Sequence, residues 1–159
     1  MNGLAYYSSP VGELLIESKD EKITIVHFLR DSKKRQISLT PVVAQCIEEL
    51  DEYFFKERKF FTVELDPAGS DFQRRVWNAL IDIPYGKTVS YEAIAIRVGD
   101  IKSIRAVGLA NGQNPIAIIV PCHRVIGKNG ELVGYGGGLE NKEWLLQHEG
   151  AILKQLSLF

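Results

Sequence analysis

The stretch IAIIVPCHRV, residues 116–125, joins a short β-branched run to a thiol, an imidazole and a guanidinium. Residues 116–120 are apolar throughout, which predicts a buried strand or another extended segment. Six glycines follow between Gly127 and Gly138, and such a stretch either lets the backbone approach a ligand closely or simply forms turns. Cys122 therefore stands between a buried segment and a glycine-rich loop.

Two short helices are predicted immediately upstream of this stretch. Ser90 is a good N-cap for a helix over 91–98, and Asp100 is a good N-cap for a helix over about 101–111. Two short helices joined by a tight turn that contains glycine are typical of a helix-turn-helix, here at about 90–112. Many other helix pairs share this pattern, so on the pattern alone DNA binding and plain helix packing both stay open.

Further helices are predicted on either side. Ser70 and Gln73 form a capping-box pattern at the start of a helix whose apolar face runs to Ile83. Residues 140–149 form another helix, which Gly150 stops.

The beginning of the chain has a different character. Runs over 4–7, 13–17 and 22–29 are rich in β-branched or aromatic residues and are separated by turn signals, which predicts a small antiparallel meander. Thr40-Pro41 opens a helix with an apolar stripe, and residues 60–65 suggest one more strand. Cys46 lies on that helical stripe, so we interpret it as a buried structural thiol.

A break at 66–69 marks the predicted domain boundary. The predicted fold class is therefore α+β. A small N-terminal antiparallel sheet with a helix occupies 1–68 and has a structural role. A mainly helical catalytic and DNA-binding domain with a helix-turn-helix follows over 69–159.

Composition excludes several classes of protein. The 159 residues are 45% hydrophobic and 25% charged, which is typical of a globular chain. No apolar run approaches the roughly 20 residues that span a bilayer, and no secretory signal is visible, so we expect a cytoplasmic protein with no membrane partner. The two cysteines cannot form a four-cysteine zinc site, and we expect neither a metal nor a cofactor.

The charge is unevenly distributed. The net charge is −1, yet residues 97–128 carry five basic residues against one acid. Because phosphate binding depends on local charge, this segment fits either a nucleic-acid contact or a solvated basic face.

Three kinds of thiol chemistry could use Cys122, which a nearby base would activate. His123 is the obvious candidate base, but consecutive side chains of an extended backbone point to opposite faces, so it would need a turn or a bridging water. Cysteine proteolysis lacks its sequence context here, and redox sensing lacks an accessible second thiol. Alkyl transfer needs only a thiolate, an alkylated leaving group and a proton donor. A buried inert thiol remains the structural alternative.

Residues 72–150 resemble the catalytic domain of O6-alkylguanine-DNA alkyltransferases, also called methylated-DNA–protein-cysteine methyltransferases. The matching segments, all in the family's order and spacing, are Val76-Trp77, Ile83-Pro84-Tyr85-Gly86, Ser90-Tyr91, Arg105-Ala106-Val107-Gly108, Asn114-Pro115, Pro121-Cys122-His123-Arg124-Val125, Tyr135-Gly136-Gly137-Gly138-Leu139, Lys142-Glu143-Trp144-Leu145-Leu146 and His148-Glu149-Gly150. Residues 1–68 resemble the family's ribonuclease H-like N-terminal domain only loosely.

The resemblance implies a single-turnover repair reaction without a cofactor. Cys122 would accept the alkyl group of O6-alkylguanine, with O4-alkylthymine as a second candidate substrate. His123 would take the thiol proton through a water, Glu149 would orient His123, and Asn114 would hold the segment that leads to Cys122. The alternative function is a non-catalytic binder or regulator of alkylated DNA, although relatives of that kind lack the cysteine.

The resemblance also implies double-stranded DNA as the partner of a monomer. The helix pair would enter the minor groove, and the damaged nucleotide would be flipped out of the stack. The residues implied to bind or flip DNA are Arg105, Tyr91, Ser90, Ala106, Gly108 and Arg124. The residues implied to line the substrate pocket are Tyr135, Gly136, Val125 and Trp77. Gly136 stands where some members carry serine, which implies a roomier pocket.

Overall fold

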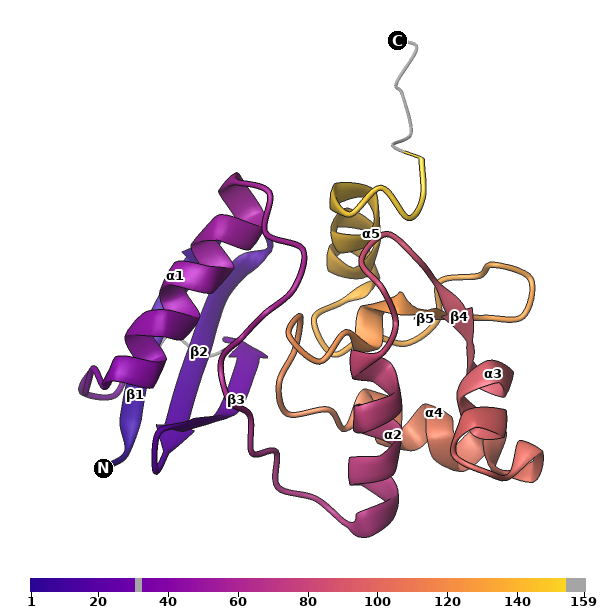
Figure 1. The fold of residues 1–159 in the computed structure, drawn as a ribbon. Coiled ribbons are helices and arrows are strands. Elements are labelled where there is room, and N and C mark those ends of the chain that lie inside the picture. Colours follow the sequence, from indigo (N-terminus) through magenta and orange to yellow (C-terminus); the bar gives the residue numbers. More distant parts are fainter. Residues whose placement is uncertain (31–32, 154–159) are drawn as a thin grey trace, which may run out of the picture.

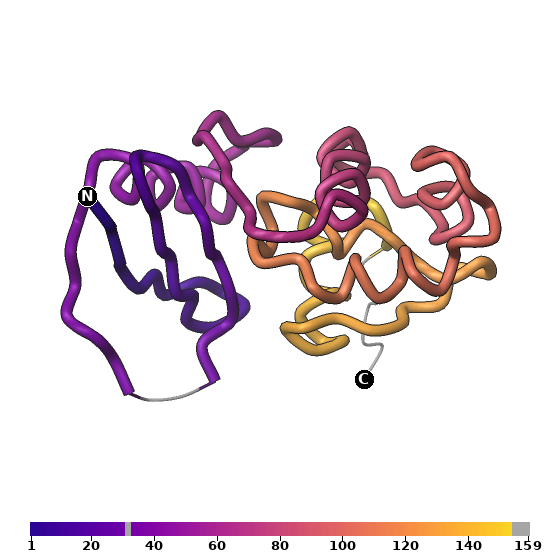
Figure 2. Tube along the Cα trace, turned by 90° about the horizontal axis from the view of Figure 1, so that it is seen from below, coloured from indigo at the N-terminus to yellow at the C-terminus, as the bar shows by residue number. Residues whose placement is uncertain are grey.

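The computed structural model describes residues 1–30 and 33–153. A three-stranded sheet with one helix forms the N-terminal half, and a group of short helices forms the C-terminal half (Figure 1). The two halves lie side by side, and the connection near residues 60–70 crosses once between them (Figure 2). The predicted α+β fold class is confirmed. No helix in the described part of the chain is long and apolar enough to cross a membrane.

The N-terminal sheet is an antiparallel meander of β1 (Gly3–Ser9), β2 (Gly12–Lys19) and β3 (Lys22–Phe28), in the order β1-β2-β3. Alternate residues of these strands face α1 (Pro41–Phe55), which covers one face of the sheet (Figure 1). Thr40 caps α1 as predicted, since its side chain accepts a hydrogen bond from the Val43 amide.

Cys46 lies in this N-terminal core and is fully buried. Burial raises the pKa of its thiol to about 12, and Glu49 adds to the shift. The predicted burial of Cys46 is therefore confirmed, and a raised pKa disfavours its thiolate.

Both outer edges of the sheet pair with other segments of the chain. Leu4 of β1 exchanges two backbone hydrogen bonds with Ser38. On the β3 edge, Ile23 bonds to Glu64 and Asp66, and Val26 bonds to Pro115 and Ala117. The Val26 bonds join the N-terminal sheet to the segment that leads into Cys122.

The C-terminal half begins with α2 (Asp71–Ile81), whose predicted capping box is present: Ser70 accepts from the Gln73 amide, and Gln73 accepts from the Ser70 amide. The elements that follow are β4 (Val89–Ser90), α3 (Tyr91–Arg97), the 3-10 turn η1 (Ile101–Ser103), α4 (Ile104–Gly112), the 3-10 turn η2 (Cys122–Arg124), β5 (Val125–Ile126) and α5 (Leu139–His148). The parallel pair β4–β5, which the sequence did not predict, places the start of α3 beside the end of η2.

Two predicted strands are wrong. Residues 60–65 contain no strand, because the carboxylate of Glu49 takes the amides of Thr62 and Val63, and only Leu65 bridges to β3. Residues 116–120 are buried as expected, but they fold as turns after a single bridge from Ile116 to Val26. Ile118 adopts a positive φ of 71°, which a strand does not allow.

Candidate active site

Cys122 begins the 3-10 turn η2, and only 7% of its surface is exposed. Asn114 holds the approach to this turn. Its side-chain amide donates to the carbonyls of Val120 (2.8 Å) and Ile116 (3.3 Å), and its oxygen accepts from the Ile116 amide (3.0 Å). A turn rather than a strand therefore presents the thiol, and its geometry places Cys122 and His123 within one tight loop.

Cys122 lines a cavity of about 420 Å³ between the two halves of the chain. The C-terminal half contributes Asn111, Gly112, Asn114, Ala117, Cys122 and residues 134–137, and the end of β3 contributes residues 27–30. Phe28 meets the ring of Tyr135 edge to face at 5.6 Å, and the Arg30 guanidinium donates to the Gly136 carbonyl. The N-terminal half thus supplies one wall of the cavity, which the sequence did not predict.

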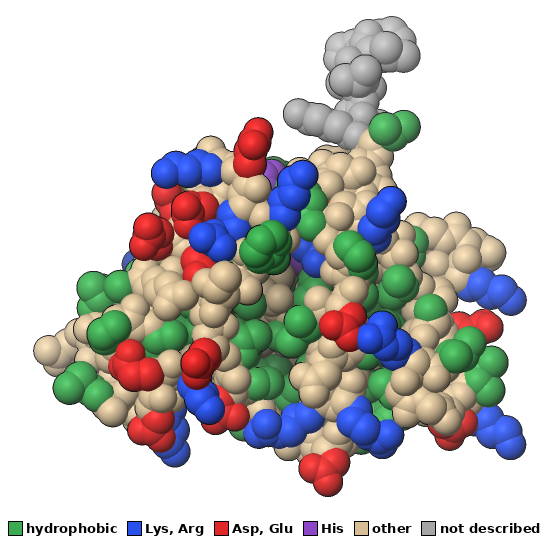
Figure 3. All heavy atoms as spheres, in the orientation of Figure 1, with side chains coloured by type: hydrophobic (Ala, Val, Ile, Leu, Met, Phe, Trp, Pro, Cys, Tyr) green, Lys and Arg blue, Asp and Glu red, His purple; other side chains and the backbone are tan. Residues whose placement is uncertain are grey.

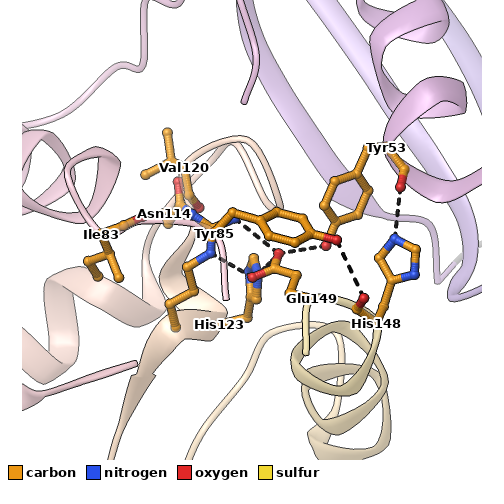
Figure 4. A network of polar contacts seen from close by, with 9 residues as sticks. Tyr53, Ile83, Tyr85, Asn114, Val120, His123, His148 and Glu149 are labelled. Atoms are coloured by element: carbon orange, nitrogen blue, oxygen red, sulfur yellow. Dashed lines mark hydrogen bonds and ion pairs between the residues drawn. The ribbon is translucent and has the colours of Figure 1, made fainter. Parts of the chain in front are cut away.

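A buried polar network includes His123, the residue that follows Cys122, and its members come from three distant parts of the chain (Figure 4). His123 Nε2 lies 2.8 Å from Glu149 Oε2. Arg124 donates to both oxygens of the same carboxylate, from Nε to Oε1 at 2.7 Å and from Nη2 to Oε2 at 3.0 Å. The Tyr53 hydroxyl of α1 donates to Oε2 at 2.7 Å.

Burial and charge set the protonation states of this network. Burial raises the pKa of the Cys122 thiol, and Asn114 and Lys142 counter only part of that rise. Burial also lowers the pKa of His123 despite the bond to Glu149, so the imidazole is neutral. Although burial opposes it, hydrogen bonds from His123 and Arg124 and the positive charge of Arg124 lower the pKa of Glu149 to about 2. The resting site therefore holds a thiol, a neutral imidazole and a carboxylate.

The neutral imidazole has one nitrogen to spare. Nε2 is taken by Glu149, while Nδ1 is buried and has no hydrogen-bond partner among the described residues. A nitrogen in this position can accept a proton.

Lys142 joins the turn to the glycine-rich loop. Its ammonium is fully buried and donates to the Val125 carbonyl (2.7 Å) and the Val133 carbonyl (2.9 Å). Burial lowers its pKa to about 8. The carbonyl of Val125, for which a role in the pocket was predicted, is therefore already engaged by a cation.

The helix pair lies on the outer side of the C-terminal half, with α3 packed on α4. Ser90 caps α3 by accepting from the Ala93 amide, and the Tyr91 hydroxyl reaches the Val133 carbonyl of the glycine-rich loop at 3.2 Å. Arg105 and Ala106 are exposed on α4, and Gly108 faces the Tyr91 ring. Tyr91 thus links the helix pair to the rim of the cavity.

Two predicted site residues lie elsewhere. Arg124 was predicted to contact DNA, but it is 6% exposed and its guanidinium is used by Glu149 and the Ile83 carbonyl. Trp77 was predicted to line the substrate pocket, but its indole packs against Gly69 and donates to the Ala110 carbonyl at 2.9 Å. Arg124 is buried because the buried carboxylate of Glu149 needs a cation beside it. Trp77 is buried because α2 turns its apolar face toward α4.

Three functional features were missed from the sequence. Tyr53 lies on the helix predicted after Thr40-Pro41 and was placed only alongside its apolar stripe. Lys142 was noted only as part of a matching segment, and residues 27–29 only as the end of a strand. One signal for the polar network was available in the sequence. Lys142 and Glu149 stand at core-facing positions of the last predicted helix, and buried charges need partners.

Both halves match models of one family. Residues 4–67 match the ribonuclease-like domain of 6-O-methylguanine DNA methyltransferase, and residues 71–151 match its DNA-binding domain. The chain belongs to the 6-O-methylguanine DNA methyltransferase family. The resemblance inferred from the sequence is thereby confirmed.

Relatives named methylated-DNA–protein-cysteine methyltransferase match this chain over nearly their whole length. The methylated-DNA–protein-cysteine methyltransferase of Methanosarcina acetivorans is 47% identical over 92% of this chain and 97% of its own. The Mycobacterium leprae protein of the same name is 46% identical over 95% and 94%. The crystal structure of Mycobacterium tuberculosis O6-methylguanine methyltransferase is 44% identical, with a TM-score of 0.86 over 95% and 94% of the two chains. A structure of Mycobacterium tuberculosis OGT in complex with DNA is 46% identical, with a TM-score of 0.83 over 92% and 91%.

The cavity wall predicts unequal effects at two adjacent glycines of this family member. A methyl group at Gly137 would lie 2.4 Å from the Phe28 ring, whereas one at Gly136 would meet nothing within 4 Å. We expect Gly137→Ala to lower the free energy of unfolding by about 1–3 kcal/mol, and Gly136→Ala to change it by less than about 0.5 kcal/mol. Chemical denaturation measures both, and equal effects at the two positions would contradict the described wall.

Proposed function

We propose that this protein repairs DNA by transferring the alkyl group of O6-alkylguanine irreversibly to Cys122. One observation carries the proposal: in a chain of this family, the Cys122 thiol lines a cavity, and the next residue, His123, is buried and bonded to Glu149. O4-alkylthymine, which carries its alkyl group on an equivalent exocyclic oxygen, is a second candidate substrate.

The reaction is a single displacement. Cys122 loses its proton to Nδ1 of His123, through one bridging water, and Glu149 stabilises the imidazolium that forms. The thiolate then forms a carbon–sulfur bond to the alkyl carbon as the carbon–O6 bond breaks. The electron pair of that bond passes to the base, which takes a proton and becomes ordinary guanine. Because a thioether is a poor leaving group, each molecule acts once.

Several residues would shape the site around the base. Tyr135 and Gly136 would line the pocket, the latter with its amide toward the guanine oxygen, and the Val125 carbonyl would remain bound to Lys142. Asn114 would fix the position of the thiol in the cavity by holding the turns that precede Cys122.

The proposed partner is double-stranded DNA bound by a monomer. The reacting oxygen of a stacked base pair is out of reach, so the nucleotide must be flipped into the cavity. The small residues Ala106 and Gly108 give α4 a thin face for the minor groove, and Ser90 fixes the start of α3 beside it. Tyr91, at the rim of the cavity, would press on the flipped nucleotide. A location in the cytoplasm stays a prediction.

Intact mass spectrometry tests the transfer. After incubation with a duplex that contains O6-methylguanine, the protein should gain the mass of one CH₂ unit, because a methyl group replaces the thiol hydrogen, and peptide mapping should place the methyl group on Cys122. A protein that binds the lesion without gaining mass would instead be a non-catalytic binder, and the proposed function would be wrong.

The flipping step makes a separate prediction at Arg105, which is exposed on α4. Arg105 would fill the space that the flipped nucleotide leaves in the duplex. We expect Arg105→Ala to slow repair of duplex DNA about 10- to 100-fold, since unstacking costs a few kcal/mol. Reaction with the free base O6-benzylguanine should change less than about threefold, because that base needs no flipping. Single-turnover rates measure both, and equal slowing would exclude the flipping role.

A further inference from the structure

Tyr53 lies on α1 in the N-terminal half, yet it contacts the two residues at the end of α5. Its hydroxyl donates to Glu149 Oε2 at 2.7 Å, and its backbone carbonyl lies 2.8 Å from His148 Nε2. Only 1% of its surface is exposed. Figure 4 shows the phenol of Tyr53 pointing from α1 of the N-terminal half toward the carboxylate of Glu149 in the C-terminal half. On the face shown in Figure 3, apolar and charged side chains both lie along the boundary between the two halves, and other polar contacts join the halves, such as that of Arg30 with the Gly136 carbonyl.

The two oxygens of Glu149 are used unequally. Oε1 accepts from Arg124 Nε, whereas Oε2 accepts from Tyr53 and Arg124 Nη2 and also bonds to His123. Tyr53 therefore shares with His123 the very oxygen that orients the imidazole. A donor on that oxygen fixes the carboxylate and weakens its pull on the imidazole proton.

We propose that Tyr53 is a positioning residue for alkyl transfer, through which the N-terminal half holds Glu149 and tunes how readily His123 gives up its proton. This inference rests on the proposed function. It assigns the N-terminal half a part in the chemistry, beyond that of a structural domain.

Other charged or titratable groups also face this pair. Arg124 lies on Glu149 from η2, and Tyr85 faces it from the loop after α2. Glu149 helps to raise the pKa of Tyr135, which lies in the glycine-rich loop. The charge of Lys142, on α5, helps to lower the pKa of His123. Burial and the neighbouring carboxylate raise the pKa of Tyr53 well above its usual value, so its hydroxyl remains a donor at every working pH.

Tyr53→Phe tests the role, because it keeps the ring contacts with Phe54, Phe61 and His148 and removes only the hydroxyl. Without that donor Glu149 holds the imidazolium more strongly, so the acid limb of the pH–rate profile should move to higher pH. We expect the transfer rate of the variant to fall relative to the wild type on the acid limb, by up to about tenfold for a shift of one pKa unit, and to change less than about threefold at pH 8.

Tyr7→Phe is the matched control. It removes another hydroxyl–carboxylate bond of the N-terminal half, from Tyr7 to Asp51 at 3.0 Å, and lies away from the site. Its pH–rate profile should coincide with that of the wild type even if its melting temperature falls.

A second substitution keeps the inference testable if Tyr53→Phe does not fold. Site-specific 3-fluorotyrosine at position 53 keeps the shape and strengthens the donor, so the acid limb should move to lower pH. A pH–rate profile that stays parallel to the wild type in the folded variants, with a change in stability alone, would overturn the role of Tyr53 while leaving alkyl transfer intact. Failure of the wild type to gain a methyl group would instead overturn the proposed function, and the role of Tyr53 with it.

Discussion

Cys122→Ser is expected to abolish alkyl transfer. A serine hydroxyl in the same buried turn would have to lose a proton that is held far more tightly than that of a thiol. We expect the rate to fall by a factor on the order of 10⁴ or more, the scale observed when a nucleophile is removed from other enzymes. Intact mass spectrometry after long incubation with lesion DNA measures the result.

Cys46→Ala provides the control for this prediction. Cys46 is fully buried in the N-terminal core, away from the cavity that Cys122 lines. The variant should lose some stability but still gain one methyl group. A methyl gain in Cys122→Ser, or its loss in a folded Cys46→Ala protein, would show that Cys122 is not the acceptor.

Glu149→Gln is expected to damage both the reaction and the fold. The amide keeps the size of the carboxylate but leaves the buried guanidinium of Arg124 without its counter-ion, and its NH₂ group would face donors. Breaking a buried ion pair in this way costs about 3–5 kcal/mol. Loss of the group that stabilises the His123 imidazolium should slow transfer about 10²- to 10⁴-fold. Denaturant unfolding and single-turnover kinetics measure the two effects.

The same carboxylate predicts how stability depends on pH. The pKa of Glu149 in the folded protein is lowered from 4.5 to about 2, so its contribution is complete above about pH 4.5 and is lost as the pH falls toward 2. That shift corresponds to about 3 kcal/mol. The wild type should lose this amount over that range and Glu149→Gln should not. Parallel pH curves for the two proteins would contradict the assignment.

Local signals in the sequence predicted most of the fold. Ser70 with Gln73, Thr40 with Pro41, and Ser90 each start a helix where expected, because a cap depends on the chemistry of neighbouring residues. Three strands separated by turn residues gave the meander for the same reason.

Predictions failed where bonds from side chains to the backbone decide the outcome. Residues 60–65 have the composition of a strand, but a carboxylate thirteen residues earlier, on Glu49, takes the Thr62 amide. Residues 116–120 pair only at Ile116, because Asn114 bonds to the carbonyls that a strand would use. Periodicity contains no information on such side-chain bonds to the backbone.

The candidate site shows the same division. Cys122 and His123 could be found from their adjacency, and Glu149 from the resemblance. Tyr53 lies 96 residues from Glu149 in the chain, and nothing local distinguishes it from a core tyrosine. The burial of Arg124 likewise follows from a partner 25 residues away.

The pairing at the margins of the small sheet has a consequence for solubility. An unpaired edge strand is a template on which another chain can add a strand and start an aggregate. Here Ser38 occupies the outer side of β1 at Leu4, while residues 64–66 and 115–117 occupy that of β3. The β3 edge thus offers fewer open hydrogen-bonding groups to its neighbours than the β1 edge, which is bridged only at Leu4 among the described residues. The chain that leads to Cys122 also shields β3, so loosening it should promote self-association.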